Sequence, residues 1–167
     1  MTGDFIDLTP LFALQAELDA EIAKTHNVSY ESTFSRRVMA LLVELGEFAN
    51  ETRCFKYWSL KGPSPKEVIL DEYADGLHFL LSLGIPLGVS QYKHFFHEVE
   101  EKDLTEAIHK VYEDVVELRK NYDVDHYAKA FRDYLSIIPL FDYSSEEVIE
   151  AYLKKLGTNH KRQQEHY

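Results

Sequence analysis

The chain has 167 residues, which is enough for one domain with a substantial core, and we expect a single domain over residues 1–167. Hydrophobic residues make up 45% of the chain, which is typical of a globular protein rather than a disordered one. The formal net charge of −11 argues against partners such as nucleic acid or an anionic membrane surface. The single cysteine, Cys54, excludes an internal disulfide and a cysteine-based zinc site.

The sequence carries no sign of export or membrane insertion. The first residues lack a basic segment followed by an apolar one, as a signal peptide would have. No apolar run is long enough to cross a bilayer as a helix. We therefore expect a soluble, cytoplasmic protein.

Helical periodicity dominates the first half of the chain. Thr9 and Pro10 have the residue types of a helix start, and apolar residues then recur at helical spacing to about residue 25. A second helix is predicted over residues 34–52. The third is predicted to begin at Ser64, with Pro65 at the first position and Glu67 completing a capping box, and to end near Gly84.

The second half of the chain gives the same pattern. Helices are predicted over residues 90–101, 103–121 and 125–138. A last helix begins at Ser144, where Glu147 completes another capping box, and reaches about Gly157. No segment has the alternation of a β-strand. The expected fold class is therefore all-α, a helical bundle of about five to seven helices with no β-sheet.

Two pairs of acidic residues stand out on these helices. Glu44 and Glu47 are three residues apart, as are Glu72 and Asp75, so each pair lies on one helical face. Glu51 follows Glu44 by seven residues and joins the same stripe. Acidic pairs on helices are commonly only solvated, and that is the simpler interpretation of Glu44 and Glu47 taken alone.

The second pair lies in a helix that is apolar nearly all round, and such a helix is normally buried. Buried carboxylates are costly unless something compensates them, and carboxylates gathered together raise each other's pKa. A hard divalent cation with oxygen ligands relieves both problems, and Mg²⁺ is the usual one where phosphates are handled. The pattern favours a metal site over carboxylates that are simply solvated at the surface.

A loop of mixed aromatic and basic residues is predicted between the two acidic helices, over residues 53–64. Its composition suits stacking on a base and neutralising phosphate. The alternative is a loop that packs Phe55 and Trp58 onto the core. The C-terminal residues are basic and polar although the chain is acidic, which fits either an anion-binding segment or a frayed terminus.

Several motifs, in order along nearly the whole chain, resemble the dimeric all-α dUTPases of the MazG-like nucleoside triphosphate pyrophosphohydrolase superfamily. They are L-Q-A-E-L-D from Leu14, E-L-G-E-F-A-N-E from Glu44, C-F-K-Y-W-S from Cys54, and E-Y-A-D-G-L-H-F-L-L-S-L-G from Glu72. The C-terminal residues are similar to the family's K…N..RQ…Y pattern. The paired acidic motifs mark the superfamily, and the F-K-Y-W-S and D-G-L-H-F-L-L-S segments mark the dUTPase branch.

The resemblance implies a homodimeric, Mg²⁺-dependent enzyme that hydrolyses dUTP, and also dUDP, to dUMP and so limits uracil incorporation into DNA. Glu44, Glu47, Glu72 and Asp75 would hold the metal, and a water held by one of the carboxylates Glu44, Glu47 and Glu51 would attack phosphorus. The substrate-binding residues would be Gln15, Lys56, Trp58, Phe79, Lys155, Asn159, Arg162 and Tyr167. Gln15 and Trp58 would contact uracil, Phe79 would exclude the thymine methyl, and the C-terminal residues would close over the phosphates.

Three alternative functions could account for the same sequence features. A related pyrophosphohydrolase for dCTP or for nucleoside triphosphates in general would share the metal site and differ in its base pocket. A di-iron helical bundle would need Glu-x-x-His motifs, to which Glu106/His109 and Asp75/His78 are partial matches. An inactive helical interaction protein would have no use for buried, uncompensated carboxylates.

Overall fold

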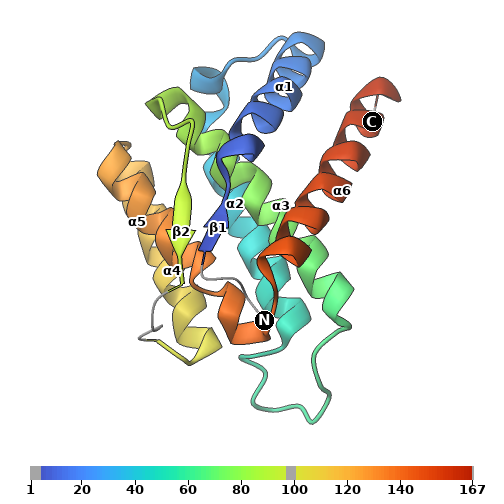
Figure 1. The fold of residues 1–167 in the computed structure, drawn as a ribbon, viewed down its shortest axis with the longest axis vertical. Coiled ribbons are helices and arrows are strands. Elements are labelled where there is room, and N and C mark those ends of the chain that lie inside the picture. The colour runs from blue at the N-terminus through green and yellow to red at the C-terminus, as the bar shows by residue number, and fades with distance from the viewer. Residues whose placement is uncertain (1–4, 97–100, 167) are drawn as a thin grey trace.

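The computed structural model describes residues 5–96 and 101–166, and over these residues the chain is mostly helical (Figure 1). The predicted all-α fold class is confirmed. The elements are β1 (Phe5–Asp7), α1 (Thr9–His26), α2 (Tyr30–Thr52), α3 (Lys66–Gly84), a 3₁₀ turn (Ile85–Leu87), β2 (Lys93–Phe95), α4 (Leu104–Lys120), α5 (Val124–Leu135), a second 3₁₀ turn (Ile138–Phe141) and α6 (Ser145–Gln164).

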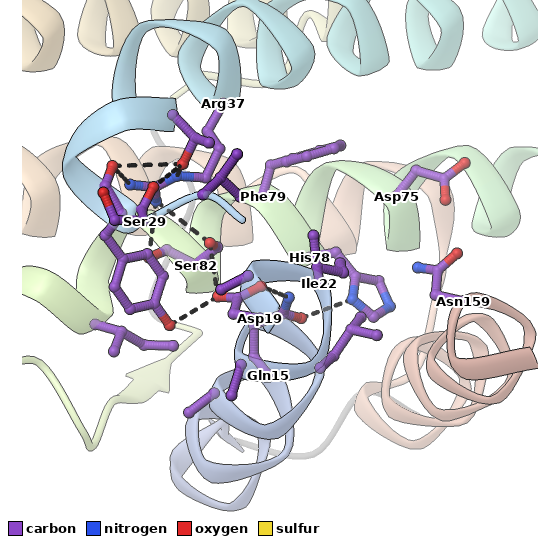
Figure 2. Close-up of a pocket in the computed structure, with 18 of the residues that line it drawn as sticks. Gln15, Asp19, Ile22, Ser29, Arg37, Asp75, His78, Phe79, Ser82 and Asn159 are labelled. Atoms are coloured by element: carbon purple, nitrogen blue, oxygen red, sulfur yellow. Dashed lines mark hydrogen bonds between the residues drawn. The ribbon is translucent and has the colours of Figure 1, made fainter. Parts of the chain in front are cut away.

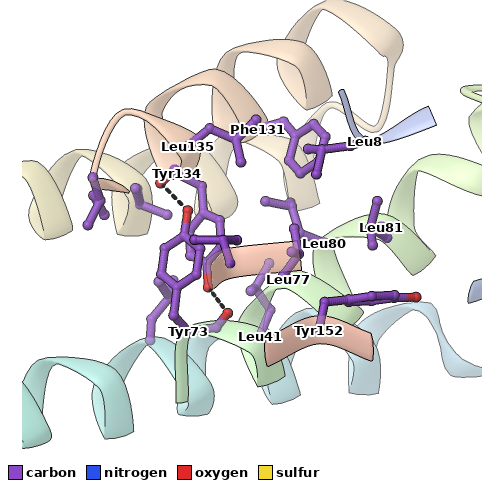
Figure 3. Packing of buried hydrophobic residues seen from close by; sticks show 14 of the residues in the cluster. Leu8, Leu41, Tyr73, Leu77, Leu80, Leu81, Phe131, Tyr134, Leu135 and Tyr152 are labelled. Atoms are coloured by element: carbon purple, nitrogen blue, oxygen red, sulfur yellow. Dashed lines mark hydrogen bonds between the residues drawn. The ribbon is translucent and has the colours of Figure 1, made fainter. Parts of the chain in front are cut away.

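Helix α3 lies at the centre of the fold, in contact with α1, α2, α5 and α6. Its apolar residues surround the helix axis, so it buries side chains on nearly every face. Figure 3 shows Leu77 and Leu80 of α3 among side chains from the neighbouring helices, including Leu41 of α2 and Leu135 of α5. This central position explains why acidic residues on α3 become partly buried.

Paired tyrosines fix the contact between α3 and the α5 region. The rings of Tyr73 and Tyr134 are stacked at 4.4 Å, and each hydroxyl donates to the backbone carbonyl of the other residue (Figure 3). Gly76, one turn after Tyr73, permits this approach, because a β-carbon there would overlap the Tyr134 hydroxyl. Gly84 makes the same room for the Tyr127 ring. The two glycines thus set how closely α5 can pack on α3.

A small antiparallel sheet corrects the prediction that the chain has no strand. Phe5 pairs with Phe95 and Asp7 with Lys93, and the central residues Ile6 and His94 point inward. The helix predicted over residues 90–101 is therefore wrong over its described part, and residues 97–100 lie outside the described residues. Pairing with a segment some ninety residues away decides the conformation here, and helical periodicity in one segment cannot report such pairing.

Three predicted helix boundaries also change. α2 begins earlier than expected, because Ser29 and Ser32 form a capping box. α3 begins at Lys66 without a side-chain cap, since the Ser64 hydroxyl donates to Glu51 instead. α6 does not end near Gly157 but continues to Gln164, although its predicted capping box between Ser144 and Glu147 is confirmed.

The sixth predicted helix, over residues 125–138, also ends early. α5 stops at Leu135 and a 3₁₀ turn containing Pro139 follows, because proline cannot continue the helical hydrogen bonds. The loop predicted between α2 and α3 is present, and Figure 1 shows it projecting from one end of the molecule. Within the described residues, no helix is both long enough and apolar enough to cross a membrane.

Candidate functional site

An acidic cluster forms where α2 packs against α3. Glu44 of α2 and Glu72 and Asp75 of α3 each offer a carboxylate oxygen, and these oxygens lie within 4.8 Å of one another. Glu47 lies within hydrogen-bonding reach of both Glu44 and Glu72. The structure therefore brings together the four residues predicted as metal ligands, because the i, i+3 spacing of each pair places both carboxylates on the facing sides of the two helices.

Burial and mutual repulsion perturb these carboxylates. Burial, with the negative charge of Asp75 next in size, raises the pKa of Glu44 to about 8. Burial and the hydrogen bond with Glu47 raise the pKa of Glu72 to about 7. The pKa of Asp75 is also raised by burial, although Lys155 opposes the effect. Without a cation, the cluster therefore holds protons near neutral pH.

The donor set fits a hard divalent cation. Glu44 Oε2 and Glu72 Oε2 are buried and have no hydrogen-bond partner in the described part of the chain. Buried carboxylate oxygens without a donor are rare, because they lose hydration without compensation. Oxygen ligands from two glutamates and an aspartate are the type that Mg²⁺ and similar cations prefer.

One buried lysine borders the cluster. Lys155 Nζ of α6 lies 3.0 Å from an Asp71 carboxylate oxygen and 3.3 Å from Asp75 Oδ1. Burial lowers the pKa of Lys155, but the hydrogen bond to Asp71 and the charge of Asp75 outweigh it and raise the pKa above its ordinary value. Lys155 thus orients Asp75 and partly offsets the negative charge of the cluster.

A cavity of about 530 Å³ extends from the acidic cluster between α1, α2, α3 and α6. Figure 2 shows Asp75 and Asn159 on one side of it and Ser29 and Arg37 on the other. Its volume is in the range of small-molecule binding sites. Because Glu44 and Asp75 belong to both the cavity wall and the cluster, a ligand in the cavity would have one end at the carboxylates.

The wall remote from the cluster is a connected polar network. Asp19 Oδ2 accepts hydrogen bonds from the Ser82 hydroxyl at 2.8 Å and the Tyr30 hydroxyl at 3.0 Å, and Asp19 Oδ1 accepts one from Gln15 Nε2 at 3.0 Å. Arg37 donates to the Ser82 carbonyl and the Tyr30 carbonyl, and so ties α2 to α3 at this end. The network is already satisfied, so this end of the cavity is preformed.

The structure places the predicted substrate-binding residues in different parts of the molecule. Gln15, Phe79, Asn159 and Arg162 line the cavity, whereas Lys155 lies at its acidic end, in ion pairs. Lys56 and Trp58 lie on the loop between α2 and α3, outside the cavity lining, and Trp58 is 64% exposed. Tyr167 lies outside the described residues.

Glu51, predicted to be catalytic, lies at the C-terminal end of α2. Its Oε2 accepts a hydrogen bond from the Ser64 hydroxyl, and its backbone carbonyl accepts one from the Ser64 amide at 3.0 Å. These bonds hold the end of the 53–65 connection, just before α3, against the C-terminal end of α2. The carboxylate is therefore oriented, although it is not one of the three that meet within 4.8 Å.

The C-terminal half of α6 contacts α1 through polar side chains. His160 Nδ1 lies 2.6 Å from Glu21 Oε2, and His26 Nε2 lies 3.1 Å from Gln163 Oε1. The segment predicted to carry cations is thus a continuous helix beside the cavity. Its closure over a substrate stays a prediction.

Sequence reasoning missed several residues of the site. Asp71, the partner of Lys155, and Arg37 gave no local signal, because their partners are distant along the chain. His78 is singled out from the sequence only in a partial di-iron match, although its position three residues after Asp75 places it on the same helical face. Tyr152 looked like an ordinary core residue, yet its hydroxyl reaches Gln15 Oε1 at 2.9 Å.

The fold and the site define an all-α protein whose carboxylate cluster faces a preformed cavity of nucleotide-compatible size. A family model described as dUTPase matches residues 7–167, and the chain belongs to this dUTPase family. The family assignment identifies the protein as a dUTP diphosphatase that hydrolyses dUTP to dUMP. No individual curated protein matches the chain.

The structure and the family match also argue against two of the alternative functions. A di-iron bundle needs histidine beside its carboxylates, but the metal-capable cluster found among the described residues consists of Glu44, Glu72 and Asp75 alone. An inactive interaction protein does not fit the family match, which covers nearly the whole chain.

Proposed function

We propose that dUTP hydrolysis by this protein depends on Mg²⁺ and that dUDP is a second substrate. The observation that carries the proposal is the set of converging carboxylates, in which Glu44 Oε2 and Glu72 Oε2 are buried without a hydrogen-bond partner in the described chain. We assign Glu44, Glu47, Glu72 and Asp75 as the ligands. Mg²⁺ bound there would polarise the phosphate chain and neutralise the charge that develops on its oxygens.

The chain's own residues have distinct roles in this proposal. Ser64 orients the Glu51 carboxylate through Oε2, and we assign the other oxygen to hydrogen-bonding the attacking water. Lys155 holds Asp75 in place, while Asn159 and Arg162 line the cavity and suit contact with phosphate oxygens. The nucleobase then occupies the remote part of the cavity, beside Gln15.

Base selection follows from the cavity wall. Gln15 supplies an amide for hydrogen bonding to uracil, and Phe79 supplies an apolar wall against the 5-methyl group of thymine. Trp58 and Lys56 lie outside the cavity lining of a single chain, so their contact with substrate requires the 53–65 loop to move or to be repositioned by a partner. Their roles remain predictions.

A homodimer would explain the apolar surface of α2 and the loop that follows it. Met39 and Val43 are four residues apart on α2 and exposed, as are Tyr57, Trp58 and Leu60 of the loop. Large apolar side chains exposed on one helix face and on one loop suit a protein interface. We propose that a second copy of the chain covers them, and we retain a cytoplasmic location as a prediction.

The deciding experiment measures product release from dUTP, dUDP, dCTP and dTTP with Mg²⁺ and with excess chelator. We expect pyrophosphate from dUTP and phosphate from dUDP only when Mg²⁺ is present, and no turnover by Glu72→Gln. Full activity of Glu72→Gln, or of the parent in chelator, would exclude the proposed metal site. Light scattering of the same samples reports the oligomeric state.

A further inference from the structure

The Gln15 side chain is held at both ends of its amide. It is 3% exposed, and its Oε1 lies 2.6 Å from His78 Nδ1 and 2.9 Å from the Tyr152 hydroxyl. At the other end, Nε2 donates to Asp19 Oδ1 at 3.0 Å. Three elements, α1, α3 and α6, therefore meet at one primary amide.

The partners define which end of the amide is oxygen. Asp19 already accepts hydrogen bonds from Tyr30 and Ser82, so it acts as an acceptor in this network. A reversed amide would place Gln15 Oε1 against Asp19 Oδ1 at about the same separation with no proton between them. The observed orientation is thus the one that pairs a donor with an acceptor at each contact of the Gln15 amide, and it requires His78 to donate through Nδ1. His78 Nε2 is buried and has no hydrogen-bond partner among the described residues.

His78 is well suited to remain a neutral donor. It is 4% exposed and its ring stacks on Tyr152 at 4.2 Å between centroids. Burial lowers the pKa of His78 to about 4, so the ring carries a single proton at neutral pH. Tyr152 is not among the residues that line the cavity, and it contacts the site through its hydrogen bond to Gln15 and its stacking on His78.

The consequence concerns base choice and rests on the proposed contact between Gln15 and the nucleobase. Gln15 Oε1 already accepts two hydrogen bonds, and one N–H of Nε2 donates to Asp19. Only the second N–H of Gln15 is therefore left to donate to the base. The 4-carbonyl of uracil accepts such a donor, whereas the 4-amino group of cytosine presents another donor. We propose that His78 and Tyr152 are positioning residues that hold Gln15 as a donor and thereby make the site select uracil over cytosine.

The test compares two conservative tyrosine variants. Tyr152→Phe keeps the ring but removes the hydroxyl that donates to Gln15, while Tyr127→Phe removes a buried hydroxyl that donates to the Leu80 carbonyl at 2.6 Å. For Tyr152→Phe we expect the ratio of kcat/KM for dUTP to that for dCTP to fall by about tenfold, mainly through KM. The control variant should keep the parent ratio. An unchanged ratio in folded Tyr152→Phe overturns the proposal.

Two further measurements separate this proposal from the one it rests on. Nitrogen-15 NMR of the parent reports the His78 tautomer, and a proton on Nε2 rather than Nδ1 overturns the assigned orientation independently of activity. Gln15→Leu should raise KM for dUTP. If it does not, the base contact of Gln15 is wrong and the positioning role is lost with it. If it does while His78 carries its proton on Nε2, only the positioning role is wrong.

Discussion

Replacing Glu44 by glutamine should stabilise the metal-free protein at alkaline pH. The pKa of this carboxyl is raised from 4.5 to about 8 in the fold, chiefly by burial. Between these values the folded state holds a proton that the unfolded state has released. Stability therefore falls as pH rises from 4.5 to 8, and the full cost is present above 8. Glutamine cannot ionise, so the variant does not carry this cost.

The size of the effect follows from the shift. Each pKa unit corresponds to about 1.4 kcal/mol, so the rise to about 8 sets an upper bound of about 5 kcal/mol. Because the Glu44 side chain keeps partial contact with water, which screens the repulsion, we expect about 2 kcal/mol. For a chain of this length, that corresponds to a rise in Tm of roughly 4 to 8 °C.

The assay is thermal unfolding in chelator at pH 5 and pH 8.5. Glu44→Gln should exceed the parent in Tm at pH 8.5 and match it closely at pH 5. Glu113→Gln is the matched control, since it removes an exposed carboxylate on α4 and should follow the parent at both values. If the parent and Glu44→Gln lose the same stability between pH 5 and 8.5, the pKa of Glu44 is not raised in the fold and the reasoning fails.

Three further predictions concern the metal, the loop between α2 and α3, and the end of α6. Mg²⁺ added at pH 7 should raise the Tm of the parent and release protons, because the pKa values of Glu44 and Glu72 are about 8 and 7 without it. Calorimetry in buffers of different ionisation enthalpy measures the number of protons released, and binding without proton release would argue against these ligands. Trp58→Ala should raise KM for dUTP at least about fivefold if the indole stacks on the base, and an unchanged KM would remove that role. Truncation after Gly157 should preserve the fold and Mg²⁺ binding but abolish turnover, and a parent-like rate would reduce the end of α6 to a structural extension.

Local periodicity was sufficient to predict the features that depend on one helix at a time. The stripe containing Glu72 and Asp75 and the pair Glu44 and Glu47 predict carboxylates on defined faces, and the structure brings those faces together. The same reasoning failed at residues 93–95, because pairing with β1 is non-local. It also failed at Ser64, whose hydroxyl bonds to Glu51 rather than capping α3.

The positioning of Gln15 could not have been predicted in this way. Its contacts with His78 and Tyr152 join residues 63 and 137 positions apart. Nothing in the local sequence distinguishes Tyr152 from the other buried tyrosines, whose hydroxyls mostly donate to backbone carbonyls. A tertiary structure is needed to find a residue that acts through a second side chain.

The arrangement of α3 connects the chemistry of the phosphates to the choice of base. Glu72, Asp75, Phe79 and Ser82 follow one another at intervals of three or four residues, so they form one stripe along the helix. Glu72 and Asp75 belong to the acidic cluster, and Phe79 and Ser82 belong to the remote cavity wall. Ten residues of helix span about 15 Å, which is comparable to the length of an extended nucleoside triphosphate. A single rigid helix, buried on its other faces, therefore fixes the distance between the carboxylates and the base-contacting wall. A substrate must fit both ends together, and a base held wrongly at one end would displace the phosphates at the other.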